Sequence, residues 1–138
     1  MKTFTTVGLL LCAAAGLSYA ETFGGKLMDA DCYREKVGLK QQTGEKTYES
    51  IAKACAPTKN SSAFAVRITD SAHYGHVGLT LKLDEKGNQM VASELQSGIL
   101  KKDHDRDVHV IIKGDSQGDS FYTSSVKPQP GHGPYVEE

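Results

Sequence analysis

The sequence predicts a mainly β protein, a small five-stranded OB-like Greek-key barrel with two short helices that follows a cleaved signal peptide. Three observations predict it. Apolar and polar residues alternate at period two in several short runs. Clusters of Gly, Asp and Ser separate these runs. A short helical pattern lies between the third and fourth runs, which is the element order of an OB barrel. An open meander capped by helices is the competing topology, and we prefer closure because it removes exposed strand edges.

Five segments carry the pattern of strands. In the third of them, four apolar residues alternate with three others, as expected of a strand with one buried face: Val77, Leu79, Leu81 and Leu83 alternate with Gly78, Thr80 and Lys82. The last two are expected to pair as a hairpin, because the Gly- and Asp-rich run 114–118 supplies a reversal between them. The five predicted strands are Thr22–Ala30, Ala63–Asp70, Val77–Leu83, Val108–Lys113 and Phe121–Val126.

Two short helices are predicted between strands. Residues 48, 51, 52 and 55 place apolar side chains on one helical face, and Pro57 ends that helix. Residues 89–97 form the second helix, with Asn88 as its N-cap and Gly98 just past its end. The polar segment Arg34–Gly44 is predicted to be a surface loop or a frayed turn, and Asp84–Gly87 a turn.

The N-terminal segment has the pattern of a signal peptide. Lys2 precedes the apolar run Val7–Leu17, and Ser18–Ala20 fits a cleavage site with small residues. Lipid attachment at Cys12 is the alternative, although Leu11 directly before it fits that processing poorly. The predicted division is a signal peptide at 1–20, one barrel domain at 21–126 and a Pro/Gly-rich flexible tail at 127–138.

Charge and composition argue against several partners. The chain has 16 Lys and Arg against 17 Asp and Glu, a net charge of −1, and it lacks Trp. Such a balanced chain lacks the basic footprint of a nucleic-acid binder or of a binder of anionic membranes. We therefore expect no nucleic-acid partner, and no stable membrane insertion once the signal is removed.

The number and spacing of the cysteines predict a disulfide. Removal of the signal leaves Cys32 and Cys55, an even pair for an oxidising compartment such as the periplasm or the extracellular space. Their wide spacing does not match a redox-active Cys-x-x-Cys motif. We expect a structural disulfide that stabilises the fold by about 3 kcal/mol.

The run from Gly25 to Cys32 (Gly-Lys-Leu-Met-Asp-Ala-Asp-Cys), the later Cys55 and the Val-rich final hairpin resemble small exported bacterial proteins of unassigned function. The resemblance covers most of the mature chain and implies an OB-like β-barrel. This chain departs from the pattern of those proteins at the fourth strand. Ile112 stands where they have an early glycine, and the glycine comes later, at Gly114. It implies no activity and no catalytic residue.

A divalent metal is the one cofactor that the sequence raises. On an extended segment, Asp105, Asp107 and His109 share a face, and imidazole with carboxylates suits zinc, copper or nickel. The spacing matches no recognised ligand motif, so solvated loop residues are the favoured interpretation and no cofactor is expected.

The sequence contains none of the catalytic motifs that would predict an enzyme. No Gly-x-Ser-x-Gly elbow, phosphate loop or dinucleotide fingerprint is present, and we expect no enzyme. An OB barrel commonly offers its second and third strands to a ligand. The candidate ligand-binding residues on those strands and their connection are Arg67, Thr69, Tyr74, Thr80 and Lys82.

The expected function is therefore that of an exported, monomeric, non-catalytic binding module of the bacterial envelope, periplasmic or secreted. Its partner would be an envelope glycan, a small anion or a protein. The alternative is a periplasmic metal-binding protein that uses the His/Asp cluster.

Overall fold

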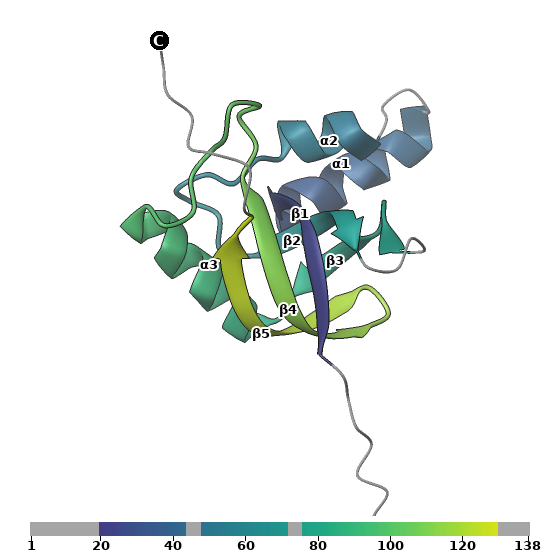
Figure 1. Ribbon diagram of the computed structural model, residues 1–138. Coiled ribbons are helices and arrows are strands. Elements are labelled where there is room, and N and C mark those ends of the chain that lie inside the picture. Colours follow the sequence, from purple (N-terminus) through teal and green to yellow (C-terminus); the bar gives the residue numbers. More distant parts are fainter. Residues whose placement is uncertain (1–19, 44–47, 72–75, 130–138) are drawn as a thin grey trace, which may run out of the picture.

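The structure is a computed structural model that describes residues 20–43, 48–71 and 76–129. It has five strands and three helices in these ranges (Figure 1). The predicted signal peptide, apart from Ala20, and the tail from residue 130 lie outside the described residues. In chain order the elements are β1 (Glu21–Asp29), α1 (Ala30–Thr43), α2 (Tyr48–Ala54), β2 (Phe64–Ser71), β3 (Thr80–Leu83), α3 (Glu85–Ser97), β4 (His109–Gln117) and β5 (Ser120–Pro128).

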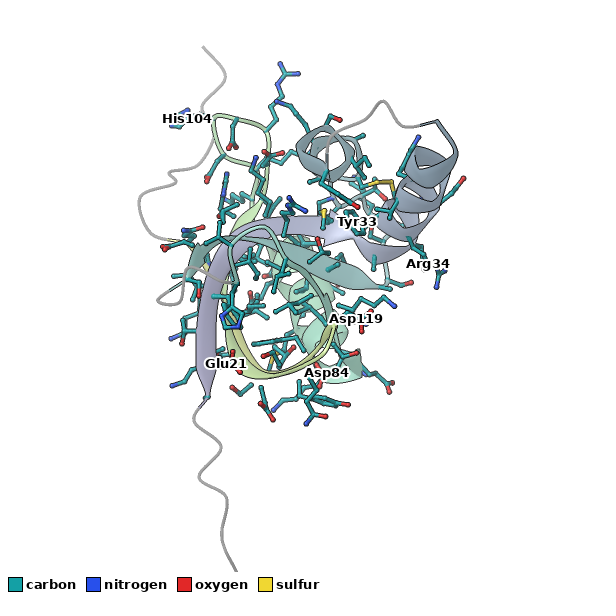
Figure 2. All side chains as sticks on the ribbon, turned by 90° about the vertical axis from the view of Figure 1, so that its right-hand side faces the viewer. Glu21, Tyr33, Arg34, Asp84, His104 and Asp119 are labelled. Atoms are coloured by element: carbon teal, nitrogen blue, oxygen red, sulfur yellow. A yellow bond between two sulfur atoms is a disulfide. The ribbon has the colours of Figure 1, made fainter. Side chains whose placement is uncertain are left out.

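The five strands form a closed barrel, which confirms the mainly β class and the predicted strand number. The strand order around the barrel is β1-β2-β3-β5-β4, and β4 pairs with β1 to close it. β3 pairs with β5 in parallel, and the other pairs are antiparallel. Figure 2 looks into the ring of strands, with α1 and α2 lying outside it.

The barrel interior holds the main core, built from the alternate residues that the sequence pattern marked. Val108, Val110 and Ile112 are buried beside Phe23 and Phe121, and these two rings meet edge to face at 5.8 Å. Burial of such side chains contributes roughly 1.5–3 kcal/mol each. The period-two pattern in this region therefore identified the buried face correctly.

Two glycines let the strands bend enough to close. The β1–β2 register shifts between Gly24 and Gly25, and the β4–β5 register shifts between Lys113 and Gly114. A Cβ at Gly25 would collide with the carbonyl oxygen of Arg67, and one at Gly114 with that of Tyr122. Both positions therefore need glycine because the neighbouring backbone comes so close.

The final hairpin is longer than predicted. β4 continues through Gly114 to Gln117, and the chain reverses at Gly118 and Asp119, where Gly118 has φ 62°. The run 114–118 is thus mostly strand, since the bulge at Gly114 restores pairing beyond it. β5 also runs two residues past the predicted domain boundary at Val126, to Pro128.

β3 is shorter than predicted because Gly78 interrupts the alternating run. Gly78 has φ 91°, and its N–H donates to the carbonyl of Ile68. The strand therefore starts at Thr80, and Val77 and Leu79 are 48% and 46% exposed. The predicted core face of this strand is correct only for Leu81 and Leu83.

The helix between β3 and β4 is confirmed, but it starts earlier than predicted. Asp84, not Asn88, is the N-cap, and its carboxylate accepts the Gly87 N–H at 3.0 Å. The predicted turn at 84–87 is consequently the start of α3. The side chain of Asn88 accepts the Phe64 N–H of β2 instead. Gly98 ends the helix in the left-handed conformation, as predicted.

The prediction of a surface loop or frayed turn at Arg34–Gly44 is wrong for residues 34–43, which form most of α1. Its sequence lacks an apolar stripe, so no periodic signal marks it. Its start is fixed instead by Asp29, whose Oδ1 accepts the Cys32 N–H at 2.9 Å. The fold therefore has three helices in the described residues rather than two.

Candidate functional site

The predicted disulfide is present and joins the two N-terminal helices. Cys32 in the first turn of α1 bonds Cys55, which follows α2, with the two Cα atoms 5.5 Å apart. Cys55 is buried, as the helical pattern of α2 predicts. Cys32 lies within α1, just past the end of β1.

The two helices cover part of the outer face of the barrel. A second apolar cluster lies there, formed by Met28 of β1, Ala52 of α2 and Ala65 of β2, with Ala30 and Tyr33 of α1 packed against it. The helices stop short of covering β3. A hollow remains at the boundary between them and the outer face of β2 and β3.

We call this hollow the Tyr–Arg groove; its volume is about 510 Å³, within the range of small-ligand sites. It draws on both helices, on β2 and β3 and on the β4–β5 turn. Figure 2 shows Tyr33, Arg34 and Asp119 on the same side of the barrel. The lining residues are Ala30, Tyr33, Arg34, Val37, Tyr48, Ala65, Arg67, Gly78, Leu79, Thr80, Lys82 and Asp119.

Two tyrosines hold polar side chains in place in the groove. The Arg67 guanidinium lies 5.3 Å from the centre of the Tyr48 ring, an attractive cation–π arrangement. The Thr80 hydroxyl donates to the Tyr33 hydroxyl at 3.1 Å. Tyr48 remains 40% exposed, so ring surface is accessible to a ligand.

Arg34 and Lys82 of the groove form exposed pairs with acidic neighbours. Lys82 Nζ lies 4.0 Å from Asp119, and Arg34 lies 2.9 Å from Asp31. Exposed pairs of this kind contribute little to stability. A ligand carboxylate could replace either acid at small energetic cost.

The structure brings together three of the five ligand-binding candidates. Arg67, Thr80 and Lys82 line the groove. Thr69 is exposed on β2 but is not among the lining residues, and Tyr74 lies outside the described residues. Sequence reasoning missed Tyr33, Arg34 and Tyr48, because it assigned Tyr33 and Arg34 to no helix and gave Tyr48 only a packing role.

The metal candidates also come together. One ligand atom each from Asp105, Asp107 and His109 lies within 4.8 Å of the others. Asp105 and Asp107 belong to the connection from α3, and His109 is the first residue of β4, where it is only 7% exposed. We call these three residues the Asp–His cluster.

Existing contacts already involve all three residues of the cluster. His109 Nε2 lies 2.7 Å from Asp105 Oδ2, and Lys26 Nζ lies 3.2 Å from Asp107 Oδ2. Burial works to raise the pKa of Asp105, but the Asp107 N–H, the His109 side chain and the Lys26 charge outweigh it and leave this pKa below its ordinary value. Asp105 is therefore a carboxylate and accepts from Nε2–H. A cation would have to displace that proton and the Lys26 ammonium.

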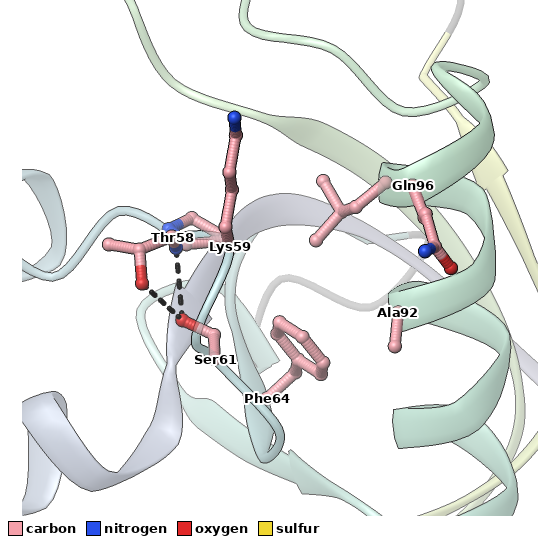
Figure 3. A pocket seen from close by; sticks show the side chains of 8 residues that line it. Thr58, Lys59, Ser61, Phe64, Ala92 and Gln96 are labelled. Carbon is pink, nitrogen blue, oxygen red and sulfur yellow. Dashed lines mark hydrogen bonds between the residues drawn. The ribbon is translucent and has the colours of Figure 1, made fainter.

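A second hollow, of about 500 Å³, lies between the loop after α2 and the outer side of α3 (Figure 3). Phe64 and Ala92 supply apolar surface there. Ser61 accepts the Thr58 N–H at 2.9 Å and donates to Asp29 Oδ2 at 2.6 Å. Thr58 and Ser61 thus bond to each other and to the α1 cap, which suits a structural role.

Among the described helices, none is both long enough and apolar enough to cross a membrane. No protein-family model, no curated protein and no solved structure matches the chain.

Proposed function

We propose that this protein is an exported, monomeric, non-catalytic binding module of the bacterial envelope, and that its ligand occupies the Tyr–Arg groove. The observation that carries the proposal is the groove itself. It combines an accessible tyrosine ring with Arg34 of α1, Arg67 of β2 and Lys82 of β3. A concave site with apolar surface and a few convergent polar groups is the usual form of a ligand site.

The barrel topology supports this choice of surface. The order β1-β2-β3-β5-β4, the parallel β3–β5 pair and the helix between β3 and β4 support the proposal of an OB-type Greek-key barrel. OB barrels bind their ligands on the face of strands 2 and 3 and the adjoining loops. The groove lies on that face.

The N-terminal pattern and the disulfide support export. Residues 1–20 have the charge, apolar run and cleavage site of a signal peptide. The Cys32–Cys55 bond is of a kind that persists in oxidising compartments. A periplasmic or secreted location accounts for both.

A fragment screen by NMR tests the groove directly, because it needs no candidate ligand. Residues 21–138, labelled with ¹⁵N and with the disulfide formed, are titrated with a library of small polar and aromatic fragments. We expect the shifted amides to concentrate around Tyr33, Tyr48 and Thr80. Hits that gather on another face, or an absence of hits, would contradict the proposal.

The Asp–His cluster supports metal binding as a second candidate, because its three donor atoms already lie close together. A thermal-shift scan against zinc, copper and nickel, with and without chelator, tests it. A native-state ligand raises the melting temperature, and His109→Ala should abolish the rise while His104→Ala, an exposed control on the same connection, keeps it. No shift with any metal would exclude this candidate.

A further inference from the structure

We infer that the Tyr–Arg groove binds a carboxylate-bearing sugar, that is, a uronic-acid unit of an acidic glycan. This inference rests on the proposed function and names the ligand class for the same groove.

Charge favours an anion. The groove is lined by three cations, Arg34, Arg67 and Lys82, and by one acid, Asp119, although the whole chain has a net charge of −1. Two of these cations already pair with exposed acids, which a ligand carboxylate would displace. The stacking of Arg67 over Tyr48 orients a planar guanidinium, whose paired N–H groups match a carboxylate in two parallel hydrogen bonds.

The remaining lining suits a sugar ring. Tyr48 and Leu79 offer exposed apolar surface, against which the C–H face of a pyranose can lie. The hydroxyls of Tyr33 and Thr80 stand beside them and can exchange hydrogen bonds with sugar hydroxyls. An acidic sugar uses all three features at once, whereas a simple anion uses only the cations.

Sheet pairing argues against a protein segment as the ligand. β3 pairs with β2 on one side and with β5 on the other, so a peptide finds no long open edge there for strand addition. A bound amphipathic helix needs a continuous apolar groove, but Arg67, Thr80 and Lys82 interrupt this one.

A phosphate group is also a poorer match. Helix N-termini are the preferred phosphate sites, and α1 begins beside the groove. Its first turn, however, already has the Asp29 carboxylate on the Cys32 N–H and the acidic Asp31 nearby. These acids repel phosphate from that position and leave the Arg67 side as the anion site.

Matched probes test the inference by NMR titration of residues 21–138. The probes are tri-galacturonate, its methyl ester, a hexaglutamate peptide and inorganic phosphate. We expect tri-galacturonate to shift groove amides and the ester, which has the same rings without charge, to bind about tenfold more weakly, the effect of about 1.4 kcal/mol. Arg67→Gln should weaken tri-galacturonate about tenfold, and the exposed Lys82→Gln should do so by a smaller factor. Lys86→Gln, an exposed control on α3, should change nothing.

Each other outcome overturns the inference in a recognisable way. Equal binding of the ester, or groove shifts only with hexaglutamate or phosphate, would reject the acidic sugar yet leave the groove as a ligand site. Binding that survives both Arg67→Gln and Lys82→Gln would reject the role of the cations. No shift with any probe would reject the inference, and the fragment screen then decides separately whether the groove binds ligands.

Discussion

At the scale of single residues, Asp84 shows how one carboxylate joins two elements. Its Oδ1 accepts the Gly87 N–H at the start of α3 and the Thr123 N–H of β5, at 3.0 and 3.1 Å. Burial works to raise the pKa of Asp84, but these hydrogen bonds outweigh it and hold the pKa below its ordinary value. The same side chain thus caps the helix and fixes it to the barrel.

Asp84→Ala is therefore expected to lower the free energy of unfolding by about 2 kcal/mol, since it removes a cap and leaves the Thr123 N–H without its acceptor. Chemical denaturation at pH 7 measures the loss. Glu85→Ala, an exposed change in the same first turn, is the control and should have a small effect. Equal stability of the two variants would show that Asp84 does not join helix and barrel.

Glu94 on α3 has a raised pKa, whereas that of Asp84 is lowered. Burial raises the pKa of its carboxyl, and Oε2 is buried without a hydrogen-bond partner in the described structure. The charged form is thus penalised in the folded state at neutral pH. We expect Glu94→Gln to raise the melting temperature at pH 7. The gain should disappear as the pH falls through the raised pKa towards the ordinary value of 4.5. A gain that persists in acid would point to another cause.

At the scale of elements, the disulfide holds together the helix pair that forms one wall of the groove. α1 contributes Tyr33 and α2 contributes Tyr48, and the Cys32–Cys55 bond joins the first turn of one helix to the end of the other. Without it, the polar α1 retains few apolar contacts with the barrel. Loss of the disulfide should therefore lower both the stability of the fold and the affinity of the groove for a ligand.

Cys55→Ser is expected to lower the melting temperature by several degrees under non-reducing conditions, in line with about 3 kcal/mol for a loop of this length. The double variant Cys32→Ser with Cys55→Ser controls for effects of a single free thiol. Wild type melted in reductant should resemble the double variant. A melting temperature unchanged in both variants would show that the bond adds no stability.

The elements that sequence alone could predict are those with a periodic apolar pattern. The alternation around Val110 and around Val66 marked β4 and β2, and Gly98 marked the end of α3. α1 escaped prediction because its stabilising contacts, the Asp29 cap and the disulfide, leave no periodicity. The length of β3 was overestimated because the residue types alternate through Gly78, whereas the positive φ of that glycine ends the strand.

At the scale of the whole molecule, the candidate site depends on barrel closure. Arg67 and Lys82 could be placed on one face from the strand pattern, and both line the groove. The tyrosines come from helices that fold back over that face, and Asp119 comes from the last hairpin, far away in sequence. No local pattern reports such contacts, since they follow from topology rather than from residue spacing.

Three carboxyl groups with lowered pKa values make the fold sensitive to acid. Asp29 caps α1, Asp84 caps α3 and bonds β5, and Asp105 bonds His109 at the start of β4. Burial works to raise the pKa of each carboxyl, but hydrogen bonds to the carboxylate outweigh it and leave each pKa lowered. A carboxyl with a lowered folded-state pKa contributes stability that is present above its unfolded value, here 3.8, and is lost as the pH falls through the folded value. Glu94 acts in the opposite direction but is a single group.

We therefore expect the free energy of unfolding to be nearly constant from pH 7 to about 5 and to fall steeply below about 4. Chemical denaturation at each pH measures this profile. Asp29→Asn with Asp84→Asn should be less stable than wild type at pH 7 but should lose less stability in acid, because two of the titrating groups are gone. A wild-type profile that stays flat to pH 3, or equal acid loss in the double variant, would show that these carboxylates do not hold the barrel and its helices together.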